Sequence, residues 1–217
     1  MIFRAKSKFP INAWSGRMTG EVAFIIGNGP SLLENNLKLI EDCFTIGINR
    51  AFRVILPKIL IWQDESLYAD CYEDIVKLPC AKVTKESIDS KNQFTHFTLE
   101  HGSFRFGNNP AVLYGGGSTA ALSVQLAVSM GFSAIILLGC DCGYKNGQTD
   151  FYGTNKNHTI TTVDNFLAAM DWVSRECPIP VINCGDAPFW PRVDLEAAIG
   201  LVRPNKKTHL EWLNKLT

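Results

Sequence analysis

Short apolar runs recur along the chain, and each is followed at once by glycine or by a polar side chain. A strand of a parallel sheet that is covered on both faces has this composition, because neither face meets water. Segments with helical periodicity lie between the runs, and this alternation predicts an α/β, Rossmann-like, doubly wound and mostly parallel sheet with helices on both faces. The predicted strands are 22–26, 43–48, 58–62, 134–138 and 180–182, and the predicted helices are 31–42, 67–78, 120–130, 163–176, 195–201 and 210–216.

The same pattern divides the chain into three parts. Residues 1–20 lack periodicity and predict an N-terminal arm, residues 21–190 predict a single Rossmann-like domain, and residues 191–217 predict a C-terminal helical tail. The pattern weakens over 66–110, which is polar with scattered aromatic residues. We interpret that segment as a lid or an irregular insertion that includes a short strand at 81–83.

The first apolar run leads into Gly27-Asn28-Gly29-Pro30-Ser31. Gly27 and Gly29 allow the backbone to approach a ligand closely. Pro30 suits the first position of a helix, because the N–H group that it lacks would be unpaired there. The amino end of such a helix binds anions, of which phosphate is the most common. The alternative is a tight turn between strand and helix that contacts no ligand.

This loop differs from a dinucleotide-binding fingerprint in two respects. Leu32 stands where the third glycine would be, and Asn49 stands at the end of the next strand, where an acidic residue would bind the ribose. The pattern therefore favours a nucleotide that is held by its phosphates and by amide side chains.

Several polar residues follow predicted strands and converge on one edge of the sheet. In parallel sheets ligands bind beyond the carboxyl ends of the strands. A second glycine run, Tyr114-Gly-Gly-Gly-Ser-Thr119, opens an alanine-rich helix and supplies Gly116, Gly117 and Ser118 to the same edge. The strand ends carry Gly27-Asn28-Gly29, Asn49, Asp64, Asp141 and Asn183.

The overall composition narrows the class of protein. Lysine plus arginine and aspartate plus glutamate balance at 21 each, so bulk charge does not indicate a nucleic-acid-binding surface. The seven cysteines have no zinc-binding spacing, and their odd number without a signal peptide predicts a reducing, cytoplasmic location. The longest apolar run, 134–138, is too short to span a membrane.

These motifs, taken together, resemble a family. Gly27-Asn-Gly-Pro-Ser-Leu32, Gly47-Ile-Asn49, Gly116-Gly-Ser118 and Leu138-Gly-Cys-Asp141 are similar to the MptE-like group and to the family 42 sialyltransferases. The MptE-like group includes 6-hydroxymethylpterin diphosphokinases and the motility accessory factor glycosyltransferases. The resemblance implies a transferase that binds a nucleotide or a nucleotide-sugar donor, with an acceptor that it does not identify.

The resemblance also implies roles for individual residues. Asn28 would lie beside the nucleotide, Asn49 would bind near the donor, and Gly117-Ser118 would form a second phosphate cradle. His158 would act as the catalytic base, in the polar loop that also offers Tyr152 to the ligand.

Three functions follow as alternatives. Glycosyl transfer from a nucleotide-activated sugar would use His158, with Asp141 near the reacting groups, and would require no cofactor. A 6-hydroxymethylpterin diphosphokinase would instead need Mg²⁺, which Asp64 and Asp141 would hold. The third alternative is a non-catalytic nucleotide-binding protein, and a homo-oligomer is left open in all three.

Overall fold

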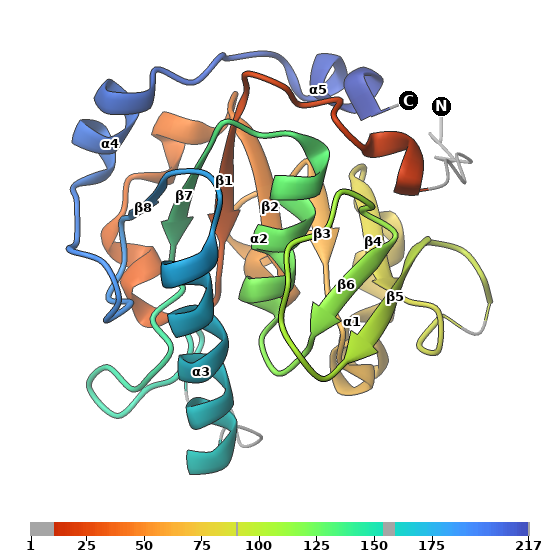
Figure 1. Ribbon diagram of the computed structural model, residues 1–217, viewed down its shortest axis with the longest axis horizontal. Helices are drawn as coiled ribbons and strands as arrows, with labels where there is room; N and C mark the ends of the chain where they lie inside the picture. Colours follow the sequence, from red (N-terminus) through yellow and green to blue (C-terminus); the bar gives the residue numbers. More distant parts are fainter. Residues whose placement is uncertain (1–10, 90, 154–158, 217) are drawn as a thin grey trace.

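The computed structural model describes residues 11–89, 91–153 and 159–216. Within these residues, eight strands form one parallel sheet in the order β6-β5-β4-β3-β2-β1-β7-β8 (Figure 1). The predicted α/β, Rossmann-like architecture is therefore confirmed. The strands are β1 (Val22–Ile26), β2 (Phe44–Ile48), β3 (Ile59–Ile61), β4 (Ala81–Lys85), β5 (Thr95–His101), β6 (Val112–Gly115), β7 (Ala134–Leu138) and β8 (Val181–Asn183).

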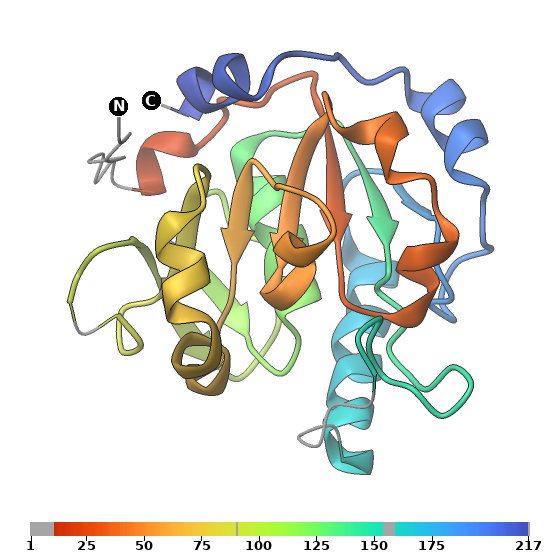
Figure 2. The ribbon, with the colours of Figure 1, turned by 180° about the vertical axis from the view of Figure 1, so that it is seen from behind.

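Helices cover both faces of the sheet. In Figure 1, α2 and α3 lie in front of the sheet, and Figure 2 shows the short helices of the first half and α1 from behind. None of the helices in the described part of the chain has the length and apolar composition needed to cross a membrane. The helices are η1 (Ile11–Trp14), η2 (Pro30–Glu34), η3 (Leu37–Ile40), η4 (Asn49–Arg53), α1 (Glu65–Lys77), α2 (Thr119–Met130), α3 (Ile160–Glu176), α4 (Leu195–Val202) and α5 (His209–Leu216).

The central strands are apolar throughout because each side chain packs against one of these two layers. All five residues of β1 are buried, and so are all five of β7 beside it. Ala23 and Ile25 of β1 join the core under α2 and α3, whereas Phe24 and Ile26 join the core under η2, η3 and α4. A buried parallel strand needs apolar residues at every position for this reason.

The predicted helix 31–42 is wrong: two short 3₁₀ helices, η2 and η3, take its place. Asn35 lies between them with an extended backbone, at φ −97° and ψ 140°. Its side-chain Nδ2 donates to the carbonyl oxygens of Ser31, at 3.0 Å, and of Cys184, at 3.1 Å. An asparagine that bonds to backbone in this way offers the chain an alternative to continuing a helix.

The segment 66–110 differs from the predicted lid or insertion. It contains most of α1 and supplies β4 and β5 to the main sheet, in which β6 is the outermost strand beside β5. Their inward residues are buried, as Phe97 of β5 and Leu113 of β6 are in the core beneath α2. The outer residues of β5 are partly or fully exposed, so the strand alternates and carries no continuous apolar run.

The C-terminal segment packs along the amino ends of the strands. Trp212 of α5 meets Phe44 of β2 edge-on, with ring centroids 5.2 Å apart, and its indole N–H donates to the carbonyl oxygen of Asp42 at 2.8 Å. Glu21, buried just before β1, forms ion pairs with Lys207 at 2.8 Å and Lys215 at 2.6 Å. The C-terminal segment therefore lies at the amino ends of the strands and not at their carboxyl ends.

Candidate functional site

A cavity of about 980 Å³ opens at the carboxyl ends of the strands. β2 lies on one side of β1, and β7 lies on the other side, so the direction in which strands are added to the sheet changes at β1. The cavity lies at this switch point, where ligands commonly bind in such sheets. Of the predicted site residues, nine line it and are brought together there: Gly27, Asn28, Gly29, Asn49, Asp64, Gly117, Ser118, Asp141 and Tyr152. Pro30, Ser31, Gly116 and Asn183 are not among the lining residues, and His158 lies outside the described residues.

Gly27 and Gly29 are required by the protein's own packing. A Cβ atom on Gly27 would lie 2.2 Å from the carbonyl oxygen of Gly139, and one on Gly29 would lie 2.4 Å from Oδ2 of Asp141. Gly29 has an ordinary extended backbone, with φ −61° and ψ 152°. The absence of a side chain at both positions therefore allows the loop after β1 to approach the loop after β7.

Asp141 is held by the groups that we predicted to bind phosphate. Its Oδ2 accepts the backbone N–H of Ser31 at 2.8 Å, and its Oδ1 accepts the hydroxyl of Ser31 and the backbone N–H of Asp186, the latter at 3.1 Å. Both side chains are buried. The backbone N–H and the hydroxyl of Ser31 therefore donate to a carboxylate of the protein itself.

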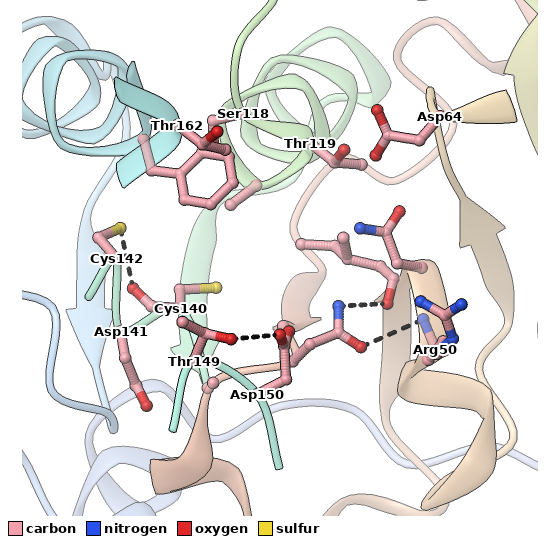
Figure 3. Close-up of a pocket in the computed structure, with 18 of the residues that line it drawn as sticks. Arg50, Asp64, Ser118, Thr119, Cys140, Asp141, Cys142, Thr149, Asp150 and Thr162 are labelled. Atoms are coloured by element: carbon pink, nitrogen blue, oxygen red, sulfur yellow. Dashed lines mark hydrogen bonds between the residues drawn. The ribbon is translucent and has the colours of Figure 1, made fainter. Parts of the chain in front are cut away.

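Asp64 and Asp141 do not fit a single shared Mg²⁺ ion. Figure 3 shows them on opposite sides of the cavity, with the carboxylate of Asp141 directed away from it. Both oxygens of Asp141 already accept hydrogen bonds. Among the residues that the structure describes, no group of three or more histidine, cysteine, aspartate or glutamate side chains is arranged to hold a metal ion.

Asn28 joins the ends of the two central strands. Its Nδ2 donates to the carbonyl oxygen of Ile48 at 3.0 Å, and its Oδ1 accepts the backbone N–H of Arg50 at 3.1 Å (Figure 3). Its own carbonyl oxygen accepts the N–H of Phe151 at 2.6 Å. The side chain thus positions the residues around the cavity.

Asn49 has an unusual environment. Its backbone is left-handed, at φ 50°, a conformation that asparagine tolerates better than most residues. Its side-chain Oδ1 is buried and has no hydrogen-bond partner among the described residues. A buried polar atom without a partner costs about 1–3 kcal/mol and needs an explanation. Asn49 also lines the cavity, so part of this residue is within reach of a bound molecule, although Oδ1 itself is enclosed by the protein.

The second glycine run forms the turn into α2. Gly115, Gly116 and Gly117 have φ values of 91°, 89° and 77°, which a residue with a side chain rarely adopts. Ser118 caps the helix, since its hydroxyl accepts the backbone N–H of Ala121 at 3.4 Å. The first backbone N–H groups of a helix have no partner within it, and residues 117–120 line the cavity.

Several lining residues were not predicted from the sequence, among them two arginines on η4. Arg50 and Arg53 follow Asn49 directly after the end of β2, and that position at a strand end was the available signal. Arg50 forms an ion pair with Asp70 of α1 at 2.8 Å and lies near the hydroxyl of Tyr152, at 3.5 Å. Other lining residues that were not predicted include Gln63, Thr119 and Asn165.

Two thiols also line the cavity, but their protonation argues against nucleophilic catalysis. Burial, together with the charge of Asp141, raises the pKa of the Cys142 thiol to about 12. Burial likewise raises the pKa of Cys140 well above its ordinary value. The thiolate is the reactive form of cysteine, so both side chains are unreactive at neutral pH.

The parallel sheet and the glycine-lined cavity at its switch point define a Rossmann-like α/β protein. A family profile described as "6-hydroxymethylpterin diphosphokinase MptE-like" matches residues 5–147. The chain belongs to this MptE-like family, as its motifs predicted.

Comparison of structures finds sialyltransferases. The sialyltransferase CstII from Campylobacter jejuni in complex with cytidine-5′-monophosphate has 14% sequence identity and a TM-score of 0.47, with 83% of this chain and 84% of that chain covered. A variant of sialyltransferase CST-II in complex with CMP has 14% identity and a TM-score of 0.49, covering 82% of this chain and 84% of that chain. No curated protein sequence matches the chain.

Proposed function

We propose that the chain is a transferase that binds a nucleotide-activated donor in the cavity at the carboxyl ends of the strands. The single observation that carries this proposal is that Asn49 and the amino end of α2 line one cavity at the carboxyl ends of the strands. A nucleotide offers groups that suit both features: hydroxyl or amino groups for the polar wall at Asn49, and phosphate for the amino end of the helix.

The phosphate is assigned to the turn at Gly117 and Ser118. The backbone N–H groups and the helix dipole favour an anion at this position. The loop at Gly27–Ser31 is less suited to this role, since Asp141 accepts the N–H of Ser31. A nucleotide of ordinary size fits a cavity of about 980 Å³.

For the reaction itself we propose glycosyl transfer. An acceptor hydroxyl must lose its proton as the bond to the sugar forms, and an imidazole has a pKa suited to that task. The family resemblance assigns the role to His158. The acceptor stays unidentified.

A Mg²⁺-dependent diphosphokinase is the second candidate, because the family description names that activity. Diphosphoryl transfer uses a divalent cation to neutralise the phosphate oxygens. The arrangement of Asp64 and Asp141 does not support a shared metal site, so we place this candidate second.

A thermal-shift panel of CMP, UDP, GDP and ATP, each with and without Mg²⁺, tests the proposal. A ligand that binds the native state alone raises its melting temperature. We expect at least one nucleotide to do so without metal. Stabilisation that requires Mg²⁺ would favour the diphosphokinase, and binding without turnover of any donor would indicate a non-catalytic nucleotide-binding protein. Failure of all nucleotides to stabilise the chain would contradict the proposal.

A further inference from the structure

Arg50 is fixed in the wall of the cavity by the chain around it. It follows Asn49 on η4, and its backbone N–H donates to Oδ1 of Asn28 at 3.1 Å. Only 17% of its side chain is exposed. The guanidinium therefore lies at the cavity rather than in bulk solvent (Figure 3).

Its side chain bridges two walls of the cavity. Nη2 donates to Oδ2 of Asp70, on α1, at 2.8 Å. Nη1 lies 3.5 Å from the hydroxyl of Tyr152, in the loop after β7, and the guanidinium carbon lies 5.3 Å from the centre of that ring. All three residues line the cavity.

The ion pair between Arg50 and Asp70 is weak enough for a ligand to replace Asp70. The side chain of Asp70 is 64% exposed, so water screens this ion pair, and ion pairs with such exposure contribute little to stability. The contact with Asp70 also joins one nitrogen to one oxygen. A phosphate group can instead accept two parallel hydrogen bonds from a guanidinium, and this geometry is stronger.

A second positive charge reinforces the same wall. Arg53, at the end of η4, also lines the cavity; it is exposed, and its Nη2 lies 3.8 Å from Sγ of Cys71 on α1. These charges are separate in sequence from the α2 amino end, to which the proposed function assigns a phosphate. The cavity thus has two distinct features that favour anions.

We propose that Arg50 binds a second phosphate group and so selects nucleoside diphosphates over nucleoside monophosphates. Asp70 then holds the guanidinium in position when no ligand is bound and gives it up to the phosphate. This inference rests on the proposed function, because it names the class of donor that the same cavity takes.

Titration calorimetry on the full chain tests the inference with CMP and CDP, UMP and UDP, GMP and GDP, and inorganic pyrophosphate. We expect at least one diphosphate to bind about 10-fold or more tightly than its monophosphate, since a charge-assisted contact is added. Arg50→Gln should reduce that ratio to about 1–2 while changing monophosphate affinity by about 2-fold or less. Arg50→Lys, which keeps the charge but loses the planar fork, should give an intermediate ratio.

Two further variants separate ligand binding from structural support. Asp70→Asn removes the competing carboxylate and should tighten diphosphate binding by about 2- to 5-fold, whereas loss of a merely structural ion pair would not. Arg175→Gln is the matched control, because it removes an ion pair of similar length, 2.7 Å to Asp171, at a residue that is not among those lining the cavity. It should leave every affinity unchanged.

The outcomes distinguish this inference from the proposed function. Nucleotides that bind without preference for the diphosphate, or a preference that survives in folded Arg50→Gln and Arg50→Lys, would overturn the inference alone. Pyrophosphate binding that depends on Arg50, without binding of any nucleotide, would overturn the proposed function and keep the anion site. Absence of binding by nucleotides and pyrophosphate alike would overturn both.

Discussion

The carboxylate of Asp141 accepts hydrogen bonds from both the backbone N–H and the hydroxyl of Ser31. The two residues are 110 positions apart and follow two adjacent strands, β1 and β7. The contact therefore joins the loop after β1 to the loop after β7 at the switch point of the sheet. Two glycines, Gly29 and Gly185, leave the space in which this carboxylate lies.

Asp141→Asn should destabilise the protein by about 1–3 kcal/mol, because an amide cannot accept all the hydrogen bonds that the buried carboxylate accepts. Urea denaturation measures the free energy of unfolding. Glu100→Gln, at an exposed ion pair with Arg105, is the control and should have little effect. Loss of turnover with unchanged stability would instead indicate a direct role of Asp141 in the reaction.

Gly29→Ala should destabilise the protein by about 1–3 kcal/mol, because the new methyl group would overlap Asp141. Thermal and urea denaturation report the change. Gly200→Ala in α4 meets no atom within 4 Å and should be neutral or stabilising by up to about 1 kcal/mol. Native stability of Gly29→Ala would show that the loop does not need this glycine for packing.

Asn49→Gly should weaken nucleotide binding by about 1–3 kcal/mol, because it removes the amide that we propose to contact the donor. Glycine is chosen because it tolerates the left-handed backbone at this position. Calorimetry with the nucleotide that stabilises the chain most gives the affinity. Asn109→Ala, in an exposed turn, is the control. Unchanged affinity in Asn49→Gly would remove this side chain from the binding site.

The stability of the protein should fall at acid pH through Glu21. Burial alone would raise the pKa of this carboxyl, but hydrogen bonds from Lys207, Lys215 and Asn205 outweigh it and lower the pKa to about 2. The folded pKa is below the ordinary value of 4.5, so the stabilisation is complete above about pH 4.5 and is lost as the pH falls toward 2.

A pKa that is lowered from 4.5 to about 2 corresponds to about 3 kcal/mol of stabilisation. Urea denaturation at several pH values between 2 and 7 measures this loss in the free energy of unfolding. Glu21→Gln should be less stable at neutral pH and should lose most of the slope below pH 4.5. A variant with the same slope as the natural chain would assign the acid sensitivity to other carboxyl groups.

His158→Ala should lower turnover by about 10²- to 10⁴-fold with nearly unchanged donor affinity, if this residue is the general base. Activity should also fall on the acid side as the imidazole gains a proton. Steady-state kinetics with the active donor, together with calorimetry, separates turnover from binding. A histidine that contacts phosphate would instead lose affinity, and the loss would depend on salt. Native turnover would remove the base assignment and weaken the case for glycosyl transfer.

The central sheet, and the strand ends that carry the cavity, could be predicted from the order of residues alone. Strands such as β1 and β7 are buried on both faces, so their apolar composition was unbroken and could be identified locally. The turn at Gly116, Gly117 and Ser118 was identifiable for a similar reason. Left-handed backbone favours glycine and a helix start favours serine, whatever surrounds them.

Features that depend on partners distant in the sequence could be identified only in the folded protein. β5 could not be identified because one of its faces is exposed, and the 3₁₀ helices arise because Asn35 bonds across to Cys184. The role of Asp141 depends on Ser31, and the position of Arg50 depends on Asn28 and Asp70. Each of these relationships joins segments that are separate in sequence. The physical reason is that a side chain's hydrogen-bond partner and burial are set by the packed neighbours rather than by adjacent residues.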